Sequence, residues 1–522
     1  MAAPLAAREP GPKASNAASM SSTIKLDSSG LPLIPQPTNS PYDPLNYPNW
    51  LKYLILGQIS TLAFLATLNV AIINPAVVPL SEEFGIAPVT GTYQTTVAIG
   101  ASSLGPLVFT PVANVYGRRP AYLFAVLVGF ASAVASATAS SYGGMIAARA
   151  VNGFGPSAAM GLGAGTVVDV FYMHERGRAM GLFTLTMTNG AHLAPIVGGY
   201  VARNLGWRWC FWVGAILNAA MFVICLFALP ETLFDRPLAT GGPGDSLSDS
   251  KAEVVHVESD ANVRQEPYTS PLMTWRTYAN RLCLWDLERP TGRRIKASDF
   301  VVKPLSMLRY PSVAFPALFY AVTYGFASIE PALTLAPIFT RLYQFDTVKN
   351  GLANGVSLLV GGSLGELCSG PVTDYMMRRA RQRHLGDGEP PAEIRLQGIW
   401  TGAIAVPVGL LIELSRYGFT VQFSNTFVAP CIGMALACFG VQIVTSVCYT
   451  YSCSDCYRTR SNDVSQCFNF FRQIFGMTLG FYSIPFGEKI GFHLSFTLFA
   501  IVCVVTFLPI LTLMRWGGIW RK

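Results

Sequence analysis

The chain has 522 residues, of which 51% are hydrophobic and only 13% are charged, whereas about a quarter of the residues of an ordinary soluble protein are charged. This composition excludes most soluble architectures, and 48 Gly and 35 Pro among long uncharged runs are typical of membrane helices. The net charge of +8 does not indicate nucleic acid, because the basic residues cluster in short loops between apolar runs, where they set membrane orientation.

Residues 1–50 are rich in Ser, Pro, Ala and Asn and contain no signal-peptide pattern, so they predict a disordered cytosolic tail. The apolar stretches that follow are long enough to cross a bilayer, whose hydrocarbon core of about 30 Å needs roughly 20 residues of helix. Twelve membrane spans are predicted, at residues 53–76, 93–113, 121–140, 143–168, 179–201, 208–229, 310–339, 349–372, 397–415, 424–450, 464–486 and 491–514.

A long polar segment, residues 230–303, separates six spans from six. We therefore predict an all-α integral membrane protein with an N-terminal six-helix bundle, a cytosolic linker, a C-terminal six-helix bundle and a short cytosolic tail. The corresponding boundaries are 51–229, 230–303, 304–516 and 517–522. An internal repeat supports the two halves, because Thr110–Arg119 aligns with Gly370–Arg379 at the same point of each half. The Arg-rich short loops place both termini and the linker in the cytosol.

Enzymatic and metal chemistry find no support in the sequence. The 11 Cys are irregularly spaced, and the 5 His lack metal-ligand spacing, so no metal site is predicted. No phosphate-binding GxxxxGK[ST] loop is present, which argues against direct use of ATP. We expect neither an enzyme nor a bound cofactor.

Two motifs carry a family resemblance. The loop between spans 2 and 3 contains Thr110, Asn114, Gly117, Arg118 and Arg119, which match the pattern G-x-x-x-D-x-x-G-R-R except at its first and its acidic positions. Span 5 contains Gly181, Gly190, Ala194, Pro195, Gly198 and Gly199, which keep every spacing of G-x8-G-x3-G-P-x2-G-G with one Gly replaced by Ala. A helix that merely packs closely would explain these glycines but not their full spacing.

On these motifs the chain resembles the major facilitator superfamily over about residues 42–516, and within it the fungal-type twelve-span drug:proton antiporters. The resemblance implies twelve transmembrane helices in two pseudo-symmetric six-helix halves. It also implies export, because the span-5 motif marks exporters in that family. Smaller matches are Leu229–Leu233 at the end of span 6 and Asn469–Arg472 in span 11.

Two charged clusters are candidate gates. The first sets Arg118 and Arg119 against Asp169 at the end of span 4, with Asn114 as a neutral departure from the pattern. The second consists of Asp374, Arg378, Arg379 and Asp455. Such clusters can hold neighbouring helices in one state and release them in another. Alternatively, these Arg residues only set the topology.

Proton coupling needs a group that titrates inside the membrane. The candidates are Glu330, which precedes Pro331 where a broken helix is expected, Glu366, His192, and Arg149 in a pattern similar to the family's R-x-x-x-G-x-G. Glu366 can instead pair with Arg378 and Arg379, His192 can be a packing residue, and Arg149 can be part of a structural ion pair.

The resemblance places spans 1, 4, 7 and 10 around a central cavity. The substrate-cavity candidates are Asn69, Asn74, Asn152, Tyr320, Tyr324, Gln442 and Tyr449, together with Arg472 of span 11. Amides and aromatic rings among apolar walls suit a bulky amphipathic ligand, although each residue can equally join helices. Two acidic residues, Glu330 and Glu366, and two basic residues, Arg149 and Arg472, lie within the spans. This balance favours neither a cationic nor an anionic substrate.

The predicted function is proton-driven export of a lipophilic drug, toxin or secondary metabolite by rocking of the two halves. The proton gradient is the energy source, and the expected partners are the small-molecule substrate and the lipid bilayer. We expect a multi-pass protein of the plasma membrane that functions as a monomer. The alternatives are an importer of small organic cations or nutrients, and a transporter-like sensor without flux.

Overall fold

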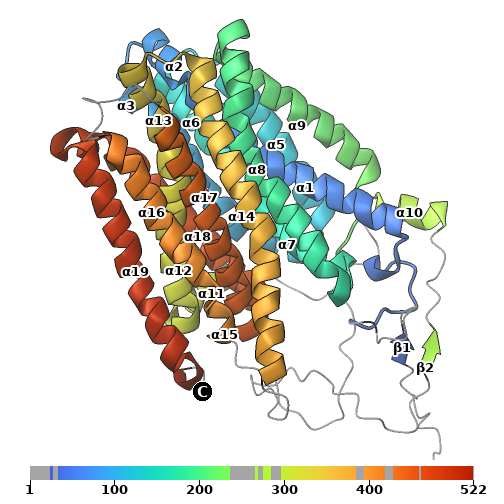
Figure 1. Ribbon diagram of the computed structural model, residues 1–522. Helices are drawn as coiled ribbons and strands as arrows, with labels where there is room; N and C mark the ends of the chain where they lie inside the picture. Colours follow the sequence, from blue (N-terminus) through green and yellow to red (C-terminus); the bar gives the residue numbers. More distant parts are fainter. Residues whose placement is uncertain are drawn as a thin grey trace, which may run out of the picture.

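The apolar runs of the sequence form long helices, because inside a bilayer each backbone N–H and C=O must find its partner within the same segment. The computed structural model (Figure 1) describes residues 24–26, 33, 35–234, 265–267, 274–283, 295–383, 393–417, 427–457 and 460–520. The long helices of both halves run side by side along a common direction.

Six helical units form the N-terminal half, and each coincides with one of the first six predicted spans. They are α1 (Asn49–Ala71) with α2 (Val77–Glu83), α3 (Pro88–Ser102) with α4 (Leu104–Tyr116), α5 (Arg118–Ala137), α6 (Tyr142–Phe154) with α7 (Ala158–Val170), α8 (Met173–Leu205) and α9 (Arg208–Ala228).

The C-terminal half repeats this plan in six further units. They are α12 (Pro311–Tyr324) joined by η5 (Gly325–Ile329) to α13 (Glu330–Tyr343), α14 (Thr347–Arg383), α15 (Glu393–Leu396) with α16 (Ile399–Tyr417), α17 (Val428–Tyr449) with η6 (Thr450–Cys456), α18 (Ser461–Ile490) and α19 (Phe492–Trp520). The twelve-span architecture predicted from the sequence is thus the one observed.

Span 7 is continuous, although the sequence predicted a break at Glu330-Pro331. The π-helical turn η5 precedes the proline, and the helix then resumes as α13. A proline ring clashes with the carbonyl four residues earlier. A locally wider turn relieves that clash and keeps the helix intact.

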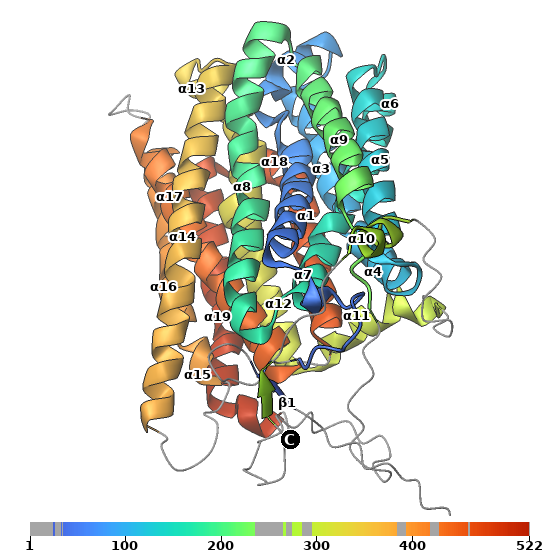
Figure 2. The same cartoon turned by 90° about the vertical axis from the view of Figure 1, so that its right-hand side faces the viewer.

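Eight of the helical units, counted over the described residues, are by themselves long and apolar enough to cross a membrane. Of the other four, α6 and α7 are short pieces of 13 residues each, whereas α8, α14 and α18 are long but more polar. Across the two halves, α8 packs against α14 and α18 packs against α3 (Figure 2). Protein therefore replaces lipid as the neighbour of these helices, which explains their lower hydropathy.

The first described residues of the chain, the end of α19 and the pieces of the linker lie at one end of the bundle, which we call the linker end (Figure 1). The linker contributes α10 (Trp275–Arg281), η3 (Ala297–Asp299), α11 (Val302–Ser306) and η4 (Met307–Arg309). A parallel two-stranded pairing joins β1 (Ile24–Leu26) to β2 (Gln265–Pro267).

Part of the predicted disordered tail is folded. Asp43 caps the short helix η1 (Pro44–Asn46) through Leu45 N–H and is fully buried. The Arg281 guanidinium donates to the Tyr42 carbonyl at 2.8 Å. The prediction of disorder is therefore wrong for residues 42–48, because linker residues far along the chain pack on this segment.

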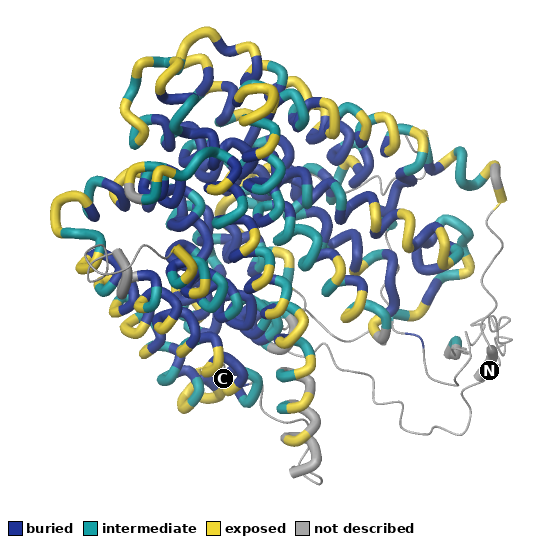
Figure 3. Tube along the Cα trace, turned by 45° about the horizontal axis from the view of Figure 1, so that its top comes forward, coloured by how far each residue is buried: buried dark blue, intermediate teal, exposed yellow. Residues whose placement is uncertain are grey.

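Buried residues concentrate between the helices, and exposed ones face outward (Figure 3). Many of the exposed side chains are large and apolar, for example Phe227, Ile216 and Leu508. A soluble protein does not tolerate such a surface, whereas lipid covers it without cost.

Candidate transport site and gating contacts

Helix α8 contacts both halves through the glycines of its motif. A Cβ atom added at Gly198 would lie 1.8 Å from the Ile72 carbonyl oxygen, and one at Gly190 would lie 2.3 Å from that of Phe64. At Gly199 the obstacle is the Thr347 carbonyl oxygen, at 2.6 Å. The motif therefore lets the α8 backbone touch the span of α1 on one side and the start of α14 on the other.

The remaining motif positions behave differently. Ala194 is fully buried, and the carbonyl of Pro195, which lies inside α8, would be 2.2 Å from a Cβ at Gly351 of α14. Gly181 has nothing within 4 Å of an added Cβ. Close backbone approach is thus confined to the part of the motif that lies far from the linker end.

Polar contacts between the halves reinforce this packing. Arg203 at the end of α8 forms a 2.8 Å ion pair with Asp346, which precedes α14. Nearer the linker end, Thr184 of α8 donates to Glu366 of α14 at 2.7 Å. Glu366 is half-buried, so the structure places it in the contact between the halves.

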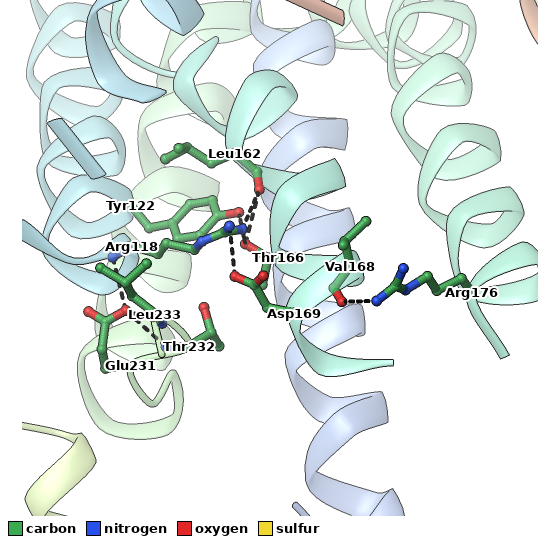
Figure 4. Close-up of polar contacts among 10 residues, drawn as sticks. All are labelled: Arg118, Tyr122, Leu162, Thr166, Val168, Asp169, Arg176, Glu231, Thr232 and Leu233. Atoms are coloured by element: carbon green, nitrogen blue, oxygen red, sulfur yellow. Dashed lines mark hydrogen bonds and ion pairs between the residues drawn. The ribbon is translucent and has the colours of Figure 1, made fainter. Parts of the chain in front are cut away.

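The first predicted gate forms around Arg118 at the linker end (Figure 4). Its guanidinium lies 2.7 Å from the Asp169 carboxylate and donates to the Thr166 hydroxyl at 3.1 Å. The Thr166 hydroxyl also lies 2.9 Å from the Tyr122 hydroxyl. Asn114 is half-buried on α4. The pairing of Arg118 with Asp169 joins the start of α5 to the end of α7.

Glu231 completes this cluster and was absent from the predicted site. Its carboxylate accepts from the backbone N–H groups of Arg118 at 2.9 Å and Arg119 at 3.2 Å, and from those of Thr232 and Leu233 at 2.9 and 2.8 Å. The Arg119 guanidinium donates to the Leu229 carbonyl at 2.7 Å. The Leu229–Leu233 match in the sequence signalled this residue, but not its role.

Glu231 therefore holds the segment after α9 against the N-terminus of α5, where an anion also meets the favourable end of the helix dipole. Replacing Glu231 by Gln should lower the free energy of unfolding by about 1–3 kcal/mol, because buried N–H groups lose a charged acceptor. Thermal unfolding of the purified protein measures this. The control is Glu82→Gln, a change at an exposed glutamate. Equal thermal midpoints for the two variants would contradict a stabilising role of Glu231.

The second predicted gate lies mostly outside the described residues. The side chains of Asp374, Arg378 and Asp455 are not among those that the structure describes, and Arg379 is exposed on α14. This cluster remains a prediction.

Arg149 is fully buried inside the N-terminal half. Its guanidinium donates to Gln94 at 2.7 Å, to the Asn69 carbonyl and the Asn152 amide oxygen at 2.8 Å, and to the Val70 carbonyl at 2.7 Å. Asn69 and Val70 end α1, so the cation caps the negative end of that helix. Backbone and amide oxygens, rather than a carboxylate, satisfy Arg149 among the described residues.

The predicted N-terminal cavity residues belong to this internal network. Asn152 donates to Ser132 at 3.1 Å, and the Asn69 side chain points at Gly214 of α9, with Oδ1 2.6 Å from an added Cβ. The Asn74 amide oxygen accepts from Thr95 at 3.2 Å. The structure therefore gives all three amides a role in joining helices of the N-terminal half.

The C-terminal cavity candidates gather around Arg472 of α18. The guanidinium lies 4.6 Å from the Tyr324 ring centre, and donates to the Tyr320 hydroxyl at 3.2 Å and to Asn469 at 2.8 Å. Tyr449 packs edge-on against Tyr320, with ring centres 5.6 Å apart. Four residues from three spans thus form one aromatic and cationic cluster. Gln442 is buried on α17 against Gly365 of α14.

Glu330 is buried to 2% exposure in α13. Its Oε1 accepts from Thr334 at 3.0 Å and Ser483 at 3.1 Å, while Oε2 has no partner among the described residues. Glu413 of α16, which lies in span 9 and was not among the predicted residues, is equally buried and lies close enough to Glu330 for the two carboxyl groups to interact. Two carboxyl groups thus share an apolar region, and neither forms an ion pair among the described residues.

His192 faces α14 and α17 from within the α8 motif. Its Nε2 lies 3.8 Å from the Cys438 sulfur, and Nδ1 has no partner among the described residues. A Cβ at Gly362 would be 2.6 Å from the ring. His192 thus fills the seam between the halves, which fits the packing alternative.

Comparison with known proteins agrees with this architecture. Residues 59–481 match the Major Facilitator Superfamily. Among curated relatives, the efflux pump radE of Floropilus chiversii is 25% identical over 470 residues, covering 90% of this chain and 81% of the pump. The MFS antiporter QDR3 of Candida albicans is 26% identical over 579 residues, covering 92% and 80% respectively.

A solved structure shares the fold. The human organic anion transporter MFSD10 (TETRAN) aligns with a TM-score of 0.55 and 16% identity, covering 89% of this chain and 100% of that one. The family match spans most of the chain and both of its six-helix halves. This multi-pass membrane protein therefore belongs to the Major Facilitator Superfamily, whose members are transporters of small molecules rather than enzymes.

Proposed function

We propose that this protein is a proton-driven exporter of lipophilic small molecules such as drugs, toxins or secondary metabolites. It operates as a monomer in the plasma membrane, and the proton gradient is its energy source without a bound cofactor. The relatives named as an efflux pump and as an antiporter support the direction of transport.

The observation that carries the proposal is the seam between α8 of the N-terminal half and α14 of the C-terminal half. Gly199 of α8 and Gly351 of α14 bring backbones of the two halves into contact far from the linker end, and the Arg203–Asp346 ion pair lies beside them. Rocking of one half against the other must open this seam, and small residues allow it to close again without trapped side chains.

Glu330 supports proton coupling. Its carboxyl is buried among hydroxyl donors without a cation among the described residues. A charge in such a place is costly, so the group is suited to carry a proton while it is buried and to release it when water reaches it. One proton bound on one side and released on the other links flux to the gradient.

The test is transport by the full chain in proteoliposomes with an imposed pH gradient, with uptake of anionic, neutral and cationic lipophilic fluorescent dyes as the readout. Export predicts that an acidic lumen drives accumulation in vesicles whose linker end faces outward. Accumulation driven by an acidic exterior would indicate an importer instead. Absence of dye and proton movement for a panel of lipophilic compounds would favour a sensor.

A further inference from the structure

Arg472 is a buried cation with no acidic partner in the described part of the chain. Only 5% of the residue is exposed, and no carboxylate forms an ion pair with it among the residues that the structure describes. Its Nε has no hydrogen-bond partner in the same part of the chain. The nearby acceptors are the neutral Tyr320 hydroxyl and the Asn469 amide oxygen.

Arg149, which also lies inside a span, provides a comparison, because all of its guanidinium nitrogens donate hydrogen bonds. The Nε and both terminal nitrogens of Arg149 donate to four oxygen acceptors. Two of these acceptors are backbone carbonyls at the end of α1. Arg472 lies in α18, and among the described residues its guanidinium donates to side-chain oxygens and to no backbone carbonyl. Its positive charge is therefore the less compensated of the two.

The nearby buried acid does not neutralise Arg472. Glu330 bonds to Ser483, which lies eleven positions further along α18, a separation of about 16 Å along a helix. An uncompensated cation in an apolar setting is costly. Binding of an anion that pairs with the guanidinium would remove that cost.

The cluster borders the surface between the halves. Tyr324 of the C-terminal half belongs to the same apolar cluster as Ile99 of α3 and Val70 of α1, and Gln473, next to Arg472, donates to Ser102 of α3 at 2.5 Å. Tyr324 and Tyr449 are only half-buried. A molecule that enters between the halves thus meets these rings directly beside the guanidinium.

We propose that Arg472 receives the carboxylate of the transported molecule, and that Tyr320, Tyr324 and Tyr449 receive its aromatic or lipophilic body. This inference rests on the proposed small-molecule transport and assigns the substrate class as lipophilic organic acids. A guanidinium offers planar paired donors that match a carboxylate. The aromatic rings contribute contact area and hold the cation in place.

Three probes that share a pyrene ring and differ in charge test the assignment: 1-pyrenebutyrate, its neutral amide and 1-pyrenebutylamine. Binding to the full chain in lipid nanodiscs is measured by energy transfer from Trp to pyrene. The wild-type protein should bind the butyrate about tenfold or more tightly than the amide, since charge-assisted hydrogen bonds contribute about 1.5–3 kcal/mol. The amine should bind most weakly.

Arg472→Gln should reduce the preference for the butyrate over the amide to less than about twofold and leave amide binding unchanged, which shows that the site is folded. Arg472→Lys should keep the order with a smaller ratio, because an ammonium lacks the planar pair of donors. It serves as the second variant if the Gln protein does not fold. Arg341→Gln, which removes an exposed cation from the end of α13, should change nothing.

Equal binding of the butyrate and the amide by the wild-type protein would overturn the proposal, as would a preference that survives in Arg472→Gln. Equilibrium binding needs neither a gradient nor a direction of transport. A protein that binds the butyrate selectively but does not export therefore contradicts only the proposed function, and one that exports without this selectivity contradicts only the site.

Discussion

Replacing Glu330 by Gln should abolish proton-driven transport while the protein remains folded. Gln keeps the shape of the side chain and can still accept from Thr334 and Ser483, which lie 3.0 and 3.1 Å from Oε1. It cannot bind or release a proton. In proteoliposomes, dye accumulation driven by a pH gradient should fall at least about tenfold, to the level seen without a gradient, because coupling requires a titrating group.

The matched control is Ser483→Ala, which removes one hydrogen bond to Glu330 and leaves the carboxyl in place. It should alter the pH at which transport is half-maximal without abolishing coupling, because a hydrogen bond changes the proton affinity of its acceptor. Glu413→Gln separates the two neighbouring carboxyls. If Glu330→Gln retains the wild-type pH dependence and Glu413→Gln loses it, the proton site is Glu413 and the assignment to Glu330 is wrong.

Much of the fold could be predicted from the sequence because bilayer thickness fixes how long an apolar run must be. That rule located α9 and α19 from hydropathy alone. The sequence also located α8 and α14, although these helices do not reach the hydropathy of a span that faces lipid all round, because their glycine-rich motifs and their places among the other spans marked them. The ordered residues 42–48 were missed, because their structure depends on contacts with Arg281, which lies far along the chain.

The site was harder to predict than the fold, because a residue type does not reveal which face of a helix is occupied by which neighbour. Asn69 and Asn152 lie in spans predicted to line the cavity, yet the Asn152 side chain accepts from Arg149 and the Asn69 side chain faces Gly214 in the interior of its own half. Arg472 and Tyr324, by contrast, do meet at the surface between the halves. The same amide chemistry serves either purpose, so contacts rather than composition decide the role.

The neutral Asn114 illustrates how a departure from a motif is compensated. The motif expects an acidic residue beside Arg118 and Arg119, and here the described negative charges at those residues are Asp169 and Glu231. Glu231 comes from the segment after α9, more than a hundred residues away. A sequence pattern confined to one loop therefore underestimates how well that loop is held.

Gly199→Ala should block transport, whereas Gly181→Ala, a change within the same motif, should be harmless. The Cβ of alanine at position 199 would lie 2.6 Å from the Thr347 carbonyl oxygen, so α8 must move away from α14 of the other half. Overpacking of this kind costs about 1–3 kcal/mol. Because the seam then cannot close, transport should fall at least about tenfold, and the thermal midpoint should fall with it.

Gly181→Ala is the same exchange of Gly for Ala at a position without close neighbours. It therefore separates the steric effect of the added methyl group from the loss of glycine itself. Nothing lies within 4 Å of an added Cβ there, and exchange of Gly for Ala inside a helix stabilises it by about 0.5–1 kcal/mol. Gly181→Ala should therefore unfold at the same or a higher temperature and transport normally. If both variants lose transport alike, glycine flexibility rather than close packing is what α8 requires. If neither does, the seam does not move during the transport cycle.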